Sequence, residues 1–220
     1  VTFDGSSDQI VDATGNFQNV VINKFGGTMY FGTDLNVAGD LTHTAGDAYL
    51  TGVTLNIIGT GAQAIDASGL AFDDVTFDST GTVTIVGSLD VNGGLVIDNA
   101  GSIDGGNLKV AKDVTINDTN WTGTSTIVLD GTGFQDVTGV SDFTVSNLNI
   151  NKTNGVAYLY GDMNLQGNLT YTAGAVDTGG LNLTIGGTSD GTVDASIGQL
   201  DSLTINNSGT RAFTGTLEVL

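Results

Sequence analysis

The stretch GDLTHTAG at residues 39–46 returns as GNLTYTAG at residues 167–174. A second pair lies downstream, with TLNIIGT at residues 54–60 and NLTIGGT at residues 182–188. In both pairs apolar residues alternate with polar ones over a few positions and then give way to glycine. Such alternation with a period of two residues, closed by turn formers, is typical of short, half-buried β-strands. The matched stretches therefore predict a repeated β-structure.

The same alternation recurs along the chain as apolar pairs separated by one polar residue. The pairs are Val20/Ile22, Leu35/Val37, Leu55/Ile57, Val83/Ile85, Leu89/Val91, Leu108/Val110, Val114/Ile116, Leu148/Ile150, Leu181/Leu183, Leu203/Ile205 and Leu217/Val219. Glycine, asparagine or aspartate follows most of them, and these residues tolerate the backbone conformations of tight turns. We expect the pairs to form the core and the Gly, Asp and Asn residues to form the corners.

A longer period is marked by a recurring acidic turn. The turns are centred on Asp12, Asp66, Asp130 and Asp194, which are 54, 64 and 64 residues apart. An apolar strand follows each turn, and a second strand starts 14 or 15 residues after the first. The pattern divides a single elongated domain, residues 1–220, into units starting near these four positions, the last of them incomplete. We place the additional residues of the second unit around 114–122 and those of the third around 136–144.

Repeats of this size, built from short strands and small turn residues, predict an all-β parallel β-solenoid, or β-helix. One coil cannot bury its apolar face alone, whereas stacked coils share a continuous core. With roughly 18 to 22 residues per coil, a unit holds about three coils and the chain about ten to twelve. The absence of proline fits this fold, because proline removes a hydrogen bond from a strand ladder. A multi-stranded sandwich or a propeller is the alternative.

The composition excludes several classes of protein. The chain has 34 Gly without a three-residue period and no Pro, which excludes collagen, and no Cys, which excludes disulfides and thiol chemistry. Hydrophobic residues make up 39% and charged residues only 13%, unlike a disordered chain. The net charge of −19 argues against nucleic-acid binding, and no apolar run is long enough for a membrane span. Glu218 is the only glutamate among 24 acidic residues. Because aspartate favours turns and glutamate favours helices, we expect almost no helix.

Two aromatic side chains are candidate site residues. His43 is the only histidine, and its repeat equivalent is Tyr171, so we interpret it as an ordinary strand residue. A catalytic triad or a histidine metal site would need partners that the sequence does not supply. Trp121, the only tryptophan, lies in the predicted insertion of the second unit. We expect it to pack the insertion against the coil rather than to stack on a sugar ring.

Carboxylates are numerous enough to raise the question of glycoside hydrolysis, which needs two of them. Asp73 and Asp74 form the only adjacent pair, and the other aspartates occur singly at turns. Lys24 and Lys152 occupy equivalent positions in the sequence Ile-Asn-Lys, which fits a structural role better than a catalytic one. We therefore predict that the protein is not an enzyme, and keep a polysaccharide-degrading β-helix enzyme as an alternative.

Calcium is the one cofactor that the composition suggests, because it prefers oxygen ligands. The glycine-rich nonapeptide of calcium-binding β-rolls is missing, and the nearest approaches lie at residues 4–8 and 186–191. The candidate ligands are Asp4, Asp8, Asp190 and Asp194. We interpret these aspartates as solvated turn residues and predict no cofactor, with Ca²⁺ as the alternative.

Threonines with Thr-x-Thr spacing raise the alternative of an ice-binding module. They occur at Thr42/Thr44, Thr82/Thr84, Thr122/Thr124 and Thr170/Thr172. They do not recur on every expected coil, so an unbroken array is not predicted. A glycan-binding module is a further alternative, and surface glycans are its expected partner.

In rhythm and composition the chain resembles the β-strand-repeat passengers of bacterial surface proteins, the filamentous-haemagglutinin-like and autotransporter-like adhesins. The matching stretches are GSLDVNGGL at residues 87–95 and GNLKV at residues 106–110. The chain is also similar in style to repeat proteins of bacterial and archaeal cell envelopes. The resemblance implies secretion, a rod-like stack and a mechanical or adhesive task, and it carries no catalytic residue across.

The residues at the two ends of the chain bear on how the protein is expected to assemble. The first residues, Val1 to Phe3, carry no initiator methionine, which suggests a processed chain or an excerpt. The last residues, Thr216 to Leu220, read as an uncapped apolar strand, which suggests a longer rod or end-to-end self-association. We expect a structural component of a secreted or cell-surface assembly: a filament subunit, a stalk or an adhesive envelope protein.

Overall fold

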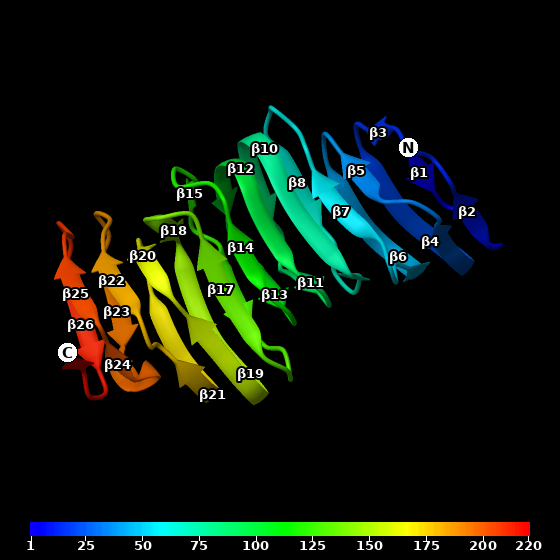
Figure 1. The fold of residues 1–220 in the computed structure, drawn as a ribbon. Helices are drawn as coiled ribbons and strands as arrows, with labels where there is room; N and C mark the ends of the chain where they lie inside the picture. The colour runs from blue at the N-terminus through cyan, green and yellow to red at the C-terminus, as the bar shows by residue number, and fades with distance from the viewer.

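The computed structural model describes residues 1–220 as a parallel β-solenoid of about 11 turns. The coils are stacked side by side from the N-terminus to the C-terminus (Figure 1). The chain has no α-helix, and its only helical element is the 3₁₀ turn η1, Ala195–Ile197. No helix has the length and apolar character needed to cross a membrane. The predicted fold class and the predicted number of coils are confirmed.

Each coil has three sides, so the stacked coils form three faces. The first face contains β1 (Thr2–Phe3), the N-terminal parts of β4 (Val20–Phe31) and β6 (Leu41–Tyr49), β8 (Gln63–Asp66), the C-terminal parts of β10 (Asp74–Ile85) and β12 (Leu95–Asp104), and β15 (Thr122–Gly123). It continues with β18 (Phe143–Val145), β20 (Gly161–Leu165), β22 (Leu181–Ile185) and β25 (Ser202–Ile205).

The second face follows the first along each coil. It contains β2 (Gln9–Val11), the C-terminal parts of β4 and β6, β9 (Ala71–Phe72), β11 (Ser88–Val91), β13 (Asn107–Val110), β16 (Thr126–Leu129), the N-terminal parts of β19 (Asn147–Leu159) and β21 (Leu169–Asp177), β23 (Gly191–Asp194) and β26 (Arg211–Thr214).

The third face closes the coil. It contains β3 (Asn16–Phe17), β5 (Leu35–Val37), β7 (Thr54–Ile57), the N-terminal parts of β10 and β12, β14 (Val114–Ile116), β17 (Gln135–Gly139), the C-terminal parts of β19 and β21, β24 (Gln199–Leu200) and β27 (Glu218–Val219). The long strands β4, β10 and β19 each bend round a corner from one face to the next.

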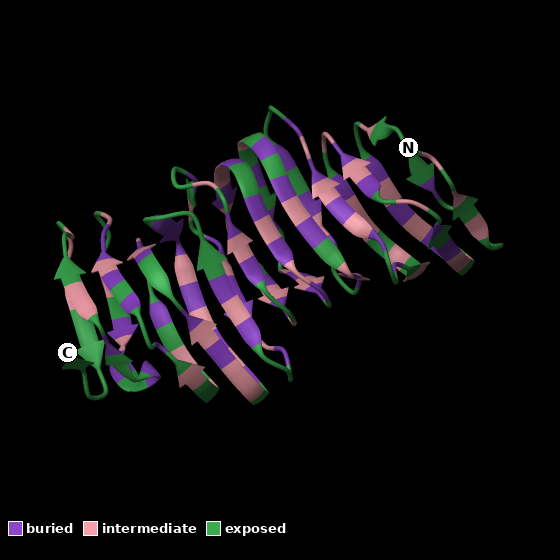
Figure 2. Cartoon of the chain, in the orientation of Figure 1, coloured by how far each residue is buried: buried purple, intermediate pink, exposed green.

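Apolar side chains stack in register through the centre of the solenoid. On the third face Leu55, Val75, Leu95, Val114 and Val137 are paired in sequence from coil to coil, and all are buried. Columns of this kind merge into one core of 49 buried residues. Along the strands, buried and exposed positions alternate (Figure 2). This alternation is the period of two that the sequence showed.

Most of the predicted apolar pairs lie in the core, and the last two do not. In the final coil Ile205 is 57% exposed and Val219 is 45% exposed, while Leu203 is half-buried and Leu217 is exposed. This coil has a neighbouring coil on only one side, so its inward-pointing side chains are covered only in part.

The sequence repeat is confirmed, but it does not contain a whole number of coils. The pairing of β4 with β6 is reproduced, with the same register shifts, in the pairing of β19 with β21. Yet Val20 lies on the first face and its equivalent Leu148 lies on the second. Each unit holds about three coils, as expected, but not a whole number of them. The repeat is a pattern of sides and corners, so the equivalent strand of each successive unit lies on a different face from that of the unit before it.

Candidate functional site

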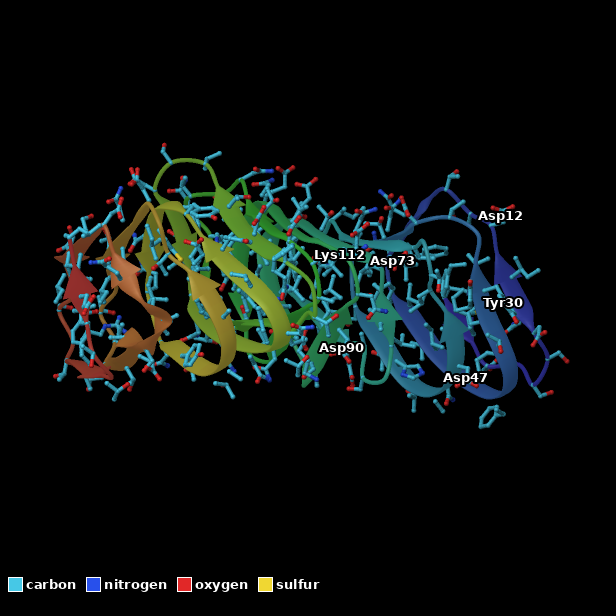
Figure 3. The ribbon with its side chains drawn as sticks, turned by 60° about the horizontal axis from the view of Figure 1, so that its bottom comes forward. Asp12, Tyr30, Asp47, Asp73, Asp90 and Lys112 are labelled. Carbon is cyan, nitrogen blue, oxygen red and sulfur yellow. The ribbon has the colours of Figure 1, made fainter.

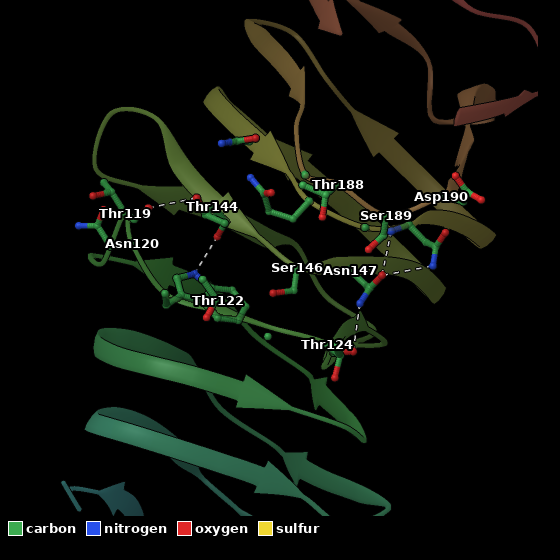
Figure 4. Close-up of a pocket in the computed structure, with 17 residues that line it drawn as sticks. Thr119, Asn120, Thr122, Thr124, Thr144, Ser146, Asn147, Thr188, Ser189 and Asp190 are labelled. Atoms are coloured by element: carbon green, nitrogen blue, oxygen red, sulfur yellow. Dashed lines mark hydrogen bonds between the residues drawn. The ribbon is translucent and has the colours of Figure 1, made fainter. Parts of the chain in front are cut away.

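The most prominent concave feature is a groove at a break in the first face. β12 pairs with β15, and β18 pairs with β20, but no strand pairing joins β15 to β18. At this break the surface is hollowed by a groove of about 750 Å³. Its walls come from four successive coils, in the segments 119–124, 144–147, 164–168 and 187–190 (Figure 4).

Side chains replace the missing strand pairing at the break. The indole Nε1–H of Trp121 donates to the carbonyl oxygen of Thr144 at 2.8 Å. The hydroxyl of Thr144 donates to the carbonyl oxygen of Thr119 at 3.1 Å. Thr119 and Trp121 lie within the insertion expected around 114–122, and Thr144 lies within that expected around 136–144. The two insertions therefore meet at the groove. Trp121 is only 1% exposed, which confirms that it packs the insertion against the coil.

The groove is lined by amide and hydroxyl side chains. Trp121 is its only hydrophobic residue and Asp190 its only ionisable one. Two residues of the groove lining carry a buried polar atom without a hydrogen-bond partner: the hydroxyl of Ser146 and the carboxamide oxygen of Asn164, which lies against Gly186. Ser146 is 2% exposed and lies between Thr122 and Asn147 (Figure 4). A buried polar atom without a partner is unusual in a native protein and calls for an explanation.

Buried polar clusters of a different kind occupy corners of the coil. The carboxamide of Gln63 donates to the carbonyl of Gly39 and accepts from the backbone N–H of Gly59. From the next coil, the hydroxyl of Ser79 lies 2.7 Å from both Gln63 Oε1 and the Gly59 carbonyl oxygen and donates its single proton to one or the other. A corner of this kind joins three consecutive coils through bonds that the strand ladders do not make.

Lys152 takes the place of Ser79 in the equivalent corner around Gln135. Its ammonium donates to the carbonyl of Gly131 at 2.9 Å and to Gln135 Oε1. Gln135 donates to the Lys112 carbonyl and accepts from Gly131, as Gln63 does in its own corner. Burial lowers the pKa of Lys152, although the charge of Asp130 opposes this effect.

Lys24 is the repeat equivalent of Lys152, and the two lysines have the same surroundings. Lys24 is 2% exposed and donates to the Ser7 carbonyl and to Gln9 Oε1 at 2.8 Å. Gly46 and Gly174, which end the two repeated stretches, pass directly over the lysines with φ of 93° and 113°. A side chain there would collide with Lys24 or Lys152, so the repeated glycines allow the coils to approach. The contacts of both lysines agree with the structural role expected for them.

Arg211 completes a fourth corner with a different residue. The position equivalent to Gln63 is occupied by Gly191, which leaves space that the Arg211 guanidinium enters from the next coil. Arg211 donates to the carbonyls of Gln166, Gly186 and Gly167. The corner is thus filled by an arginine where the other units use glutamine. These corners were not predicted from the sequence, although the spacing Gly-x-x-x-Gln recurs at 5–9, 59–63 and 131–135.

The aspartates cap backbone groups at the corners. Asp74 accepts from the N–H of Gly94 at 2.7 Å, twenty residues further on and one coil away, and Asp34 accepts from Thr54 in the same way. Asp73 accepts from the N–H of Gly52 at 2.5 Å. In Figure 3, Asp12, Asp47 and Asp73 lie at the periphery of the ribbon, and of these Asp73 caps a backbone N–H. The short side chain that reaches the neighbouring turn accounts for the use of aspartate rather than glutamate.

The four aspartates considered as calcium ligands do not form a cluster. Asp8 accepts from the N–H of Thr28 at 2.8 Å, and Asp190 accepts from that of Thr210 at 2.7 Å. Asp194 accepts from the N–H of Ser196 in its own turn. Asp4 makes no hydrogen bond through its side chain. No cluster of three or more His, Asp or Glu side chains that could hold a metal ion is present. Asp190 is the one candidate that lines the groove.

His43 and Tyr171 make the same local contact. His43 Nε2 lies 2.9 Å from the carbonyl oxygen of Gly46, and the Tyr171 hydroxyl donates to that of Gly174 at 2.5 Å. His43 Nδ1 also lies 2.5 Å from the Ser68 carbonyl oxygen in the next coil. Both rings therefore brace the bend of their own strand, in agreement with the interpretation of His43 as an ordinary strand residue.

One ionisable cluster lies on the second face. Lys109 Nζ is 3.4 Å from Asp90 Oδ1, and both side chains are 42% exposed. Asp130 lies nearby, and burial raises its pKa, with a further contribution from the charge of Asp90. All three side chains line a shallow depression on this face.

Exposed aromatic side chains form two clusters that the sequence analysis did not identify. Tyr158 stacks on Tyr160 with ring centroids 5.6 Å apart and contacts Phe134 at 5.9 Å, and Phe134 is 71% exposed. Nearer the N-terminus, the ring centroids of Tyr30 and Tyr49 lie 5.8 Å apart. Tyr30 and Tyr158 are repeat equivalents, so the spacing of 128 residues was the signal that could have found them.

The threonines do not form a regular array. On the first face Thr82 and Thr122 flank Ser102 in one column, while Thr42 is in register with Asp66. Thr170 lies on the second face, in register with Asn149.

Comparison of the chain with protein-family models, curated proteins and solved structures finds no match.

Proposed function

We propose that the protein is a structural component of a secreted or cell-surface assembly, such as a stalk, a filament subunit or an envelope protein with adhesive capacity. The observation that supports this role is the single core of 49 residues, which runs from Phe3 in the first coil to Leu200. Parallel strand pairing and the Gln63- and Gln135-type corners link each coil to the next. Such a stack holds its length and transmits force along its axis.

The proposed role is not catalytic. Asp73 and Asp74, the adjacent carboxylates, both accept backbone N–H groups at corners, and the two repeated lysines bond carbonyl and carboxamide oxygens. These contacts engage the adjacent carboxylates and the repeated lysines, the groups that the sequence offered for hydrolysis. The resemblance to filamentous-haemagglutinin-like and autotransporter-like passengers supports the same structural and extracellular assignment.

End-to-end self-association is part of the proposal, because a parallel ladder extends when another coil adds in the same register. The net charge of −19 opposes the approach of two copies, and salt screens such repulsion beyond about 10 Å at 0.1 M. Assembly is therefore expected to increase with salt or divalent cations. Filaments that persist unchanged in chelator at low salt would contradict this part.

The experiment is immunoelectron microscopy of the source cells with an antibody raised against this chain. We expect label on the outer surface or on extracellular material, and rods or fibres in negatively stained, affinity-purified native protein. Label confined to the cell interior, or native protein seen only as isolated globular particles, would overturn the proposal.

A further inference from the structure

We propose that the groove at the break between β15 and β18 is a binding site for a neutral carbohydrate chain. The groove extends over four coils, and stacked strands are spaced by about 4.8 Å, so its length of about 15 Å suits a short linear oligosaccharide. The proposal goes beyond the structural role, which the stack fulfils with or without a ligand.

The chemistry of the walls matches that of sugar hydroxyls. Carboxamides such as those of Asn164 and Gln166 offer both donors and acceptors, and the hydroxyl of Thr188 does the same. The hydroxyl of Thr122 donates to the Gly101 carbonyl at 3.2 Å and still offers an acceptor. A sugar hydroxyl also donates and accepts, so each ligand group finds a partner of either kind. A site of this composition selects for hydroxyl-rich ligands rather than apolar ones.

The charge of the groove favours a neutral ligand. The chain as a whole carries −19, yet Asp190 is the only ionisable residue in the walls. One oxygen of Asp190 already accepts from the N–H of Thr210. Arg211, which donates to the carbonyls of Gln166 and Gly167 behind the wall, offsets the charge of Asp190, so the groove offers no excess positive charge. An anionic polysaccharide would still meet the negative field of the chain. A cationic ligand would find more carboxylates almost anywhere else on the surface.

The floor of the groove holds polar groups that the chain itself leaves unpaired. The Ser146 hydroxyl and the Asn164 carboxamide oxygen have no partner, while the equally buried Ser79 hydroxyl has two acceptors at 2.7 Å. Ser146 is 2% exposed and faces the groove from its centre (Figure 4). Both atoms are shielded from solvent, so the Asn164 carboxamide and the Ser146 hydroxyl must rotate toward the groove before a ligand hydroxyl can satisfy them.

A peptide strand is the obvious competitor, because the broken ladder exposes strand edges, but it does not fit between the coils. Immediately beyond the groove, Ile127 pairs with Leu148 in the continuous ladder of β16 and β19. Asn147 also bridges to the carbonyls of Thr124 and Ser125. The two coils are thus held one strand spacing apart, and no additional strand can enter. A ligand must lie over the break, in the groove.

The test is titration of the full chain with cellohexaose, maltohexaose and the hexamer of N-acetylglucosamine, with hexagalacturonic acid as the charged counterpart. Binding is measured by calorimetry, and the site is located by amide chemical shifts. We expect at least one neutral hexasaccharide to bind and to shift residues of segments 119–124 and 164–168. We expect hexagalacturonic acid to bind more weakly or not at all.

Two variants alter the groove and one serves as a matched control. Asn164→Ala removes a carboxamide from the floor, and Thr122→Tyr covers the groove from an exposed position; each is expected to weaken binding by about tenfold or more. Asn56→Ala removes a carboxamide that bonds Asn36 on the third face and is expected to leave binding unchanged. Circular dichroism confirms that each variant is folded.

Several results would overturn the proposal. They are the failure of all three neutral hexasaccharides to bind at millimolar concentration, preferential binding of hexagalacturonic acid, and binding that folded Asn164→Ala and Thr122→Tyr retain in full. The last result, with shifts at Tyr158 and Tyr160, would assign the ligand to the exposed aromatic cluster instead. None of these outcomes bears on the structural role, which the microscopy tests separately.

Discussion

The corner around Gln63 and the groove are both buried and polar, but they differ in whether their polar side-chain atoms have hydrogen-bond partners. In the corner around Gln63, the carboxamide and the Ser79 hydroxyl all have partners inside the chain. In the groove, the Ser146 hydroxyl and the Asn164 oxygen have none. Both regions are deeply buried, so burial alone does not separate a structural polar group from one available to a ligand. Unpaired polar atoms also occur away from the groove, among them the hydroxyl of Ser125 and Nδ2 of Asn207. We therefore infer a binding site only where such atoms coincide with the groove.

Gln135→Leu is expected to have the largest effect on the corners. The substitution removes the carboxamide that binds Lys152 and leaves a buried ammonium with one fewer partner, so we expect a loss of about 3 kcal/mol in the free energy of unfolding. Denaturant titration measures it. Gln18→Leu, at an exposed position, is the control and should change stability little. A loss no larger than that of the control would show that the corner around Gln135 does not stabilise the fold.

Gln63→Leu should cost less, about 2 kcal/mol, because the group left behind is the neutral hydroxyl of Ser79 rather than an ammonium. Hydrogen exchange of the Gly59 N–H, which loses its acceptor, should increase. If the two glutamine variants prove equally destabilised, the charge of Lys152 is not what distinguishes the two corners.

Asp74→Ala tests the capping role of the aspartates and should cost about 1 kcal/mol, the usual effect of losing a side-chain cap. Asp74→Asn keeps the acceptor for the Gly94 N–H and should retain most of the stability, whereas Asp74→Glu should not. Asp201, which is exposed and makes no side-chain hydrogen bond, supplies the control substitution to Ala. Equal tolerance of Asp, Glu and Ala at position 74 would refute the explanation for the rarity of glutamate.

Asp130→Asn should raise the free energy of unfolding slightly, and the size of the increase should depend on pH. Because burial and Asp90 raise the pKa of Asp130 in the folded state, its ionisation opposes folding. The penalty is absent below the unfolded pKa of 3.8 and grows as the pH rises through the folded value. The variant should therefore be more stable than the parent near pH 7 and equal to it below the unfolded pKa. Urea titrations at both pH values check this, and a variant less stable at pH 7 would be the contrary result.

The fold could be predicted from the sequence because its determinants are local. Alternation such as Val20/Ile22 fixes which side chains point inward, and the match of 39–46 with 167–174 indicated a repeat that the strand pairing confirms. The phase of the repeat could not be predicted. Equivalent strands look the same on any face, and only the sum of all the turn lengths shows that Leu148 has moved to the second face.

The groove and the corners were not predicted for a different reason. Each joins residues from coils about twenty positions apart, such as Trp121 with Thr144 or Gln135 with Lys112. The two insertions were located in the sequence, but nothing there showed that they meet. Whether a buried hydroxyl is paired depends on backbone carbonyls, which carry no sequence signal, so Ser79 and Ser146 look alike until the fold is known.

The most direct test is therefore the same substitution at these two serines, Ser79→Ala and Ser146→Ala, measured by denaturant titration under identical conditions. Ser79 and Ser146 are 0% and 2% exposed, so burial is matched. We expect Ser79→Ala to lose about 1–3 kcal/mol, because the Gly59 carbonyl or Gln63 Oε1 loses a donor. Ser146→Ala should leave stability unchanged or raise it, because the hydroxyl that it removes has no partner. Equal losses at the two positions would contradict the distinction between paired structural groups and an unpaired binding groove.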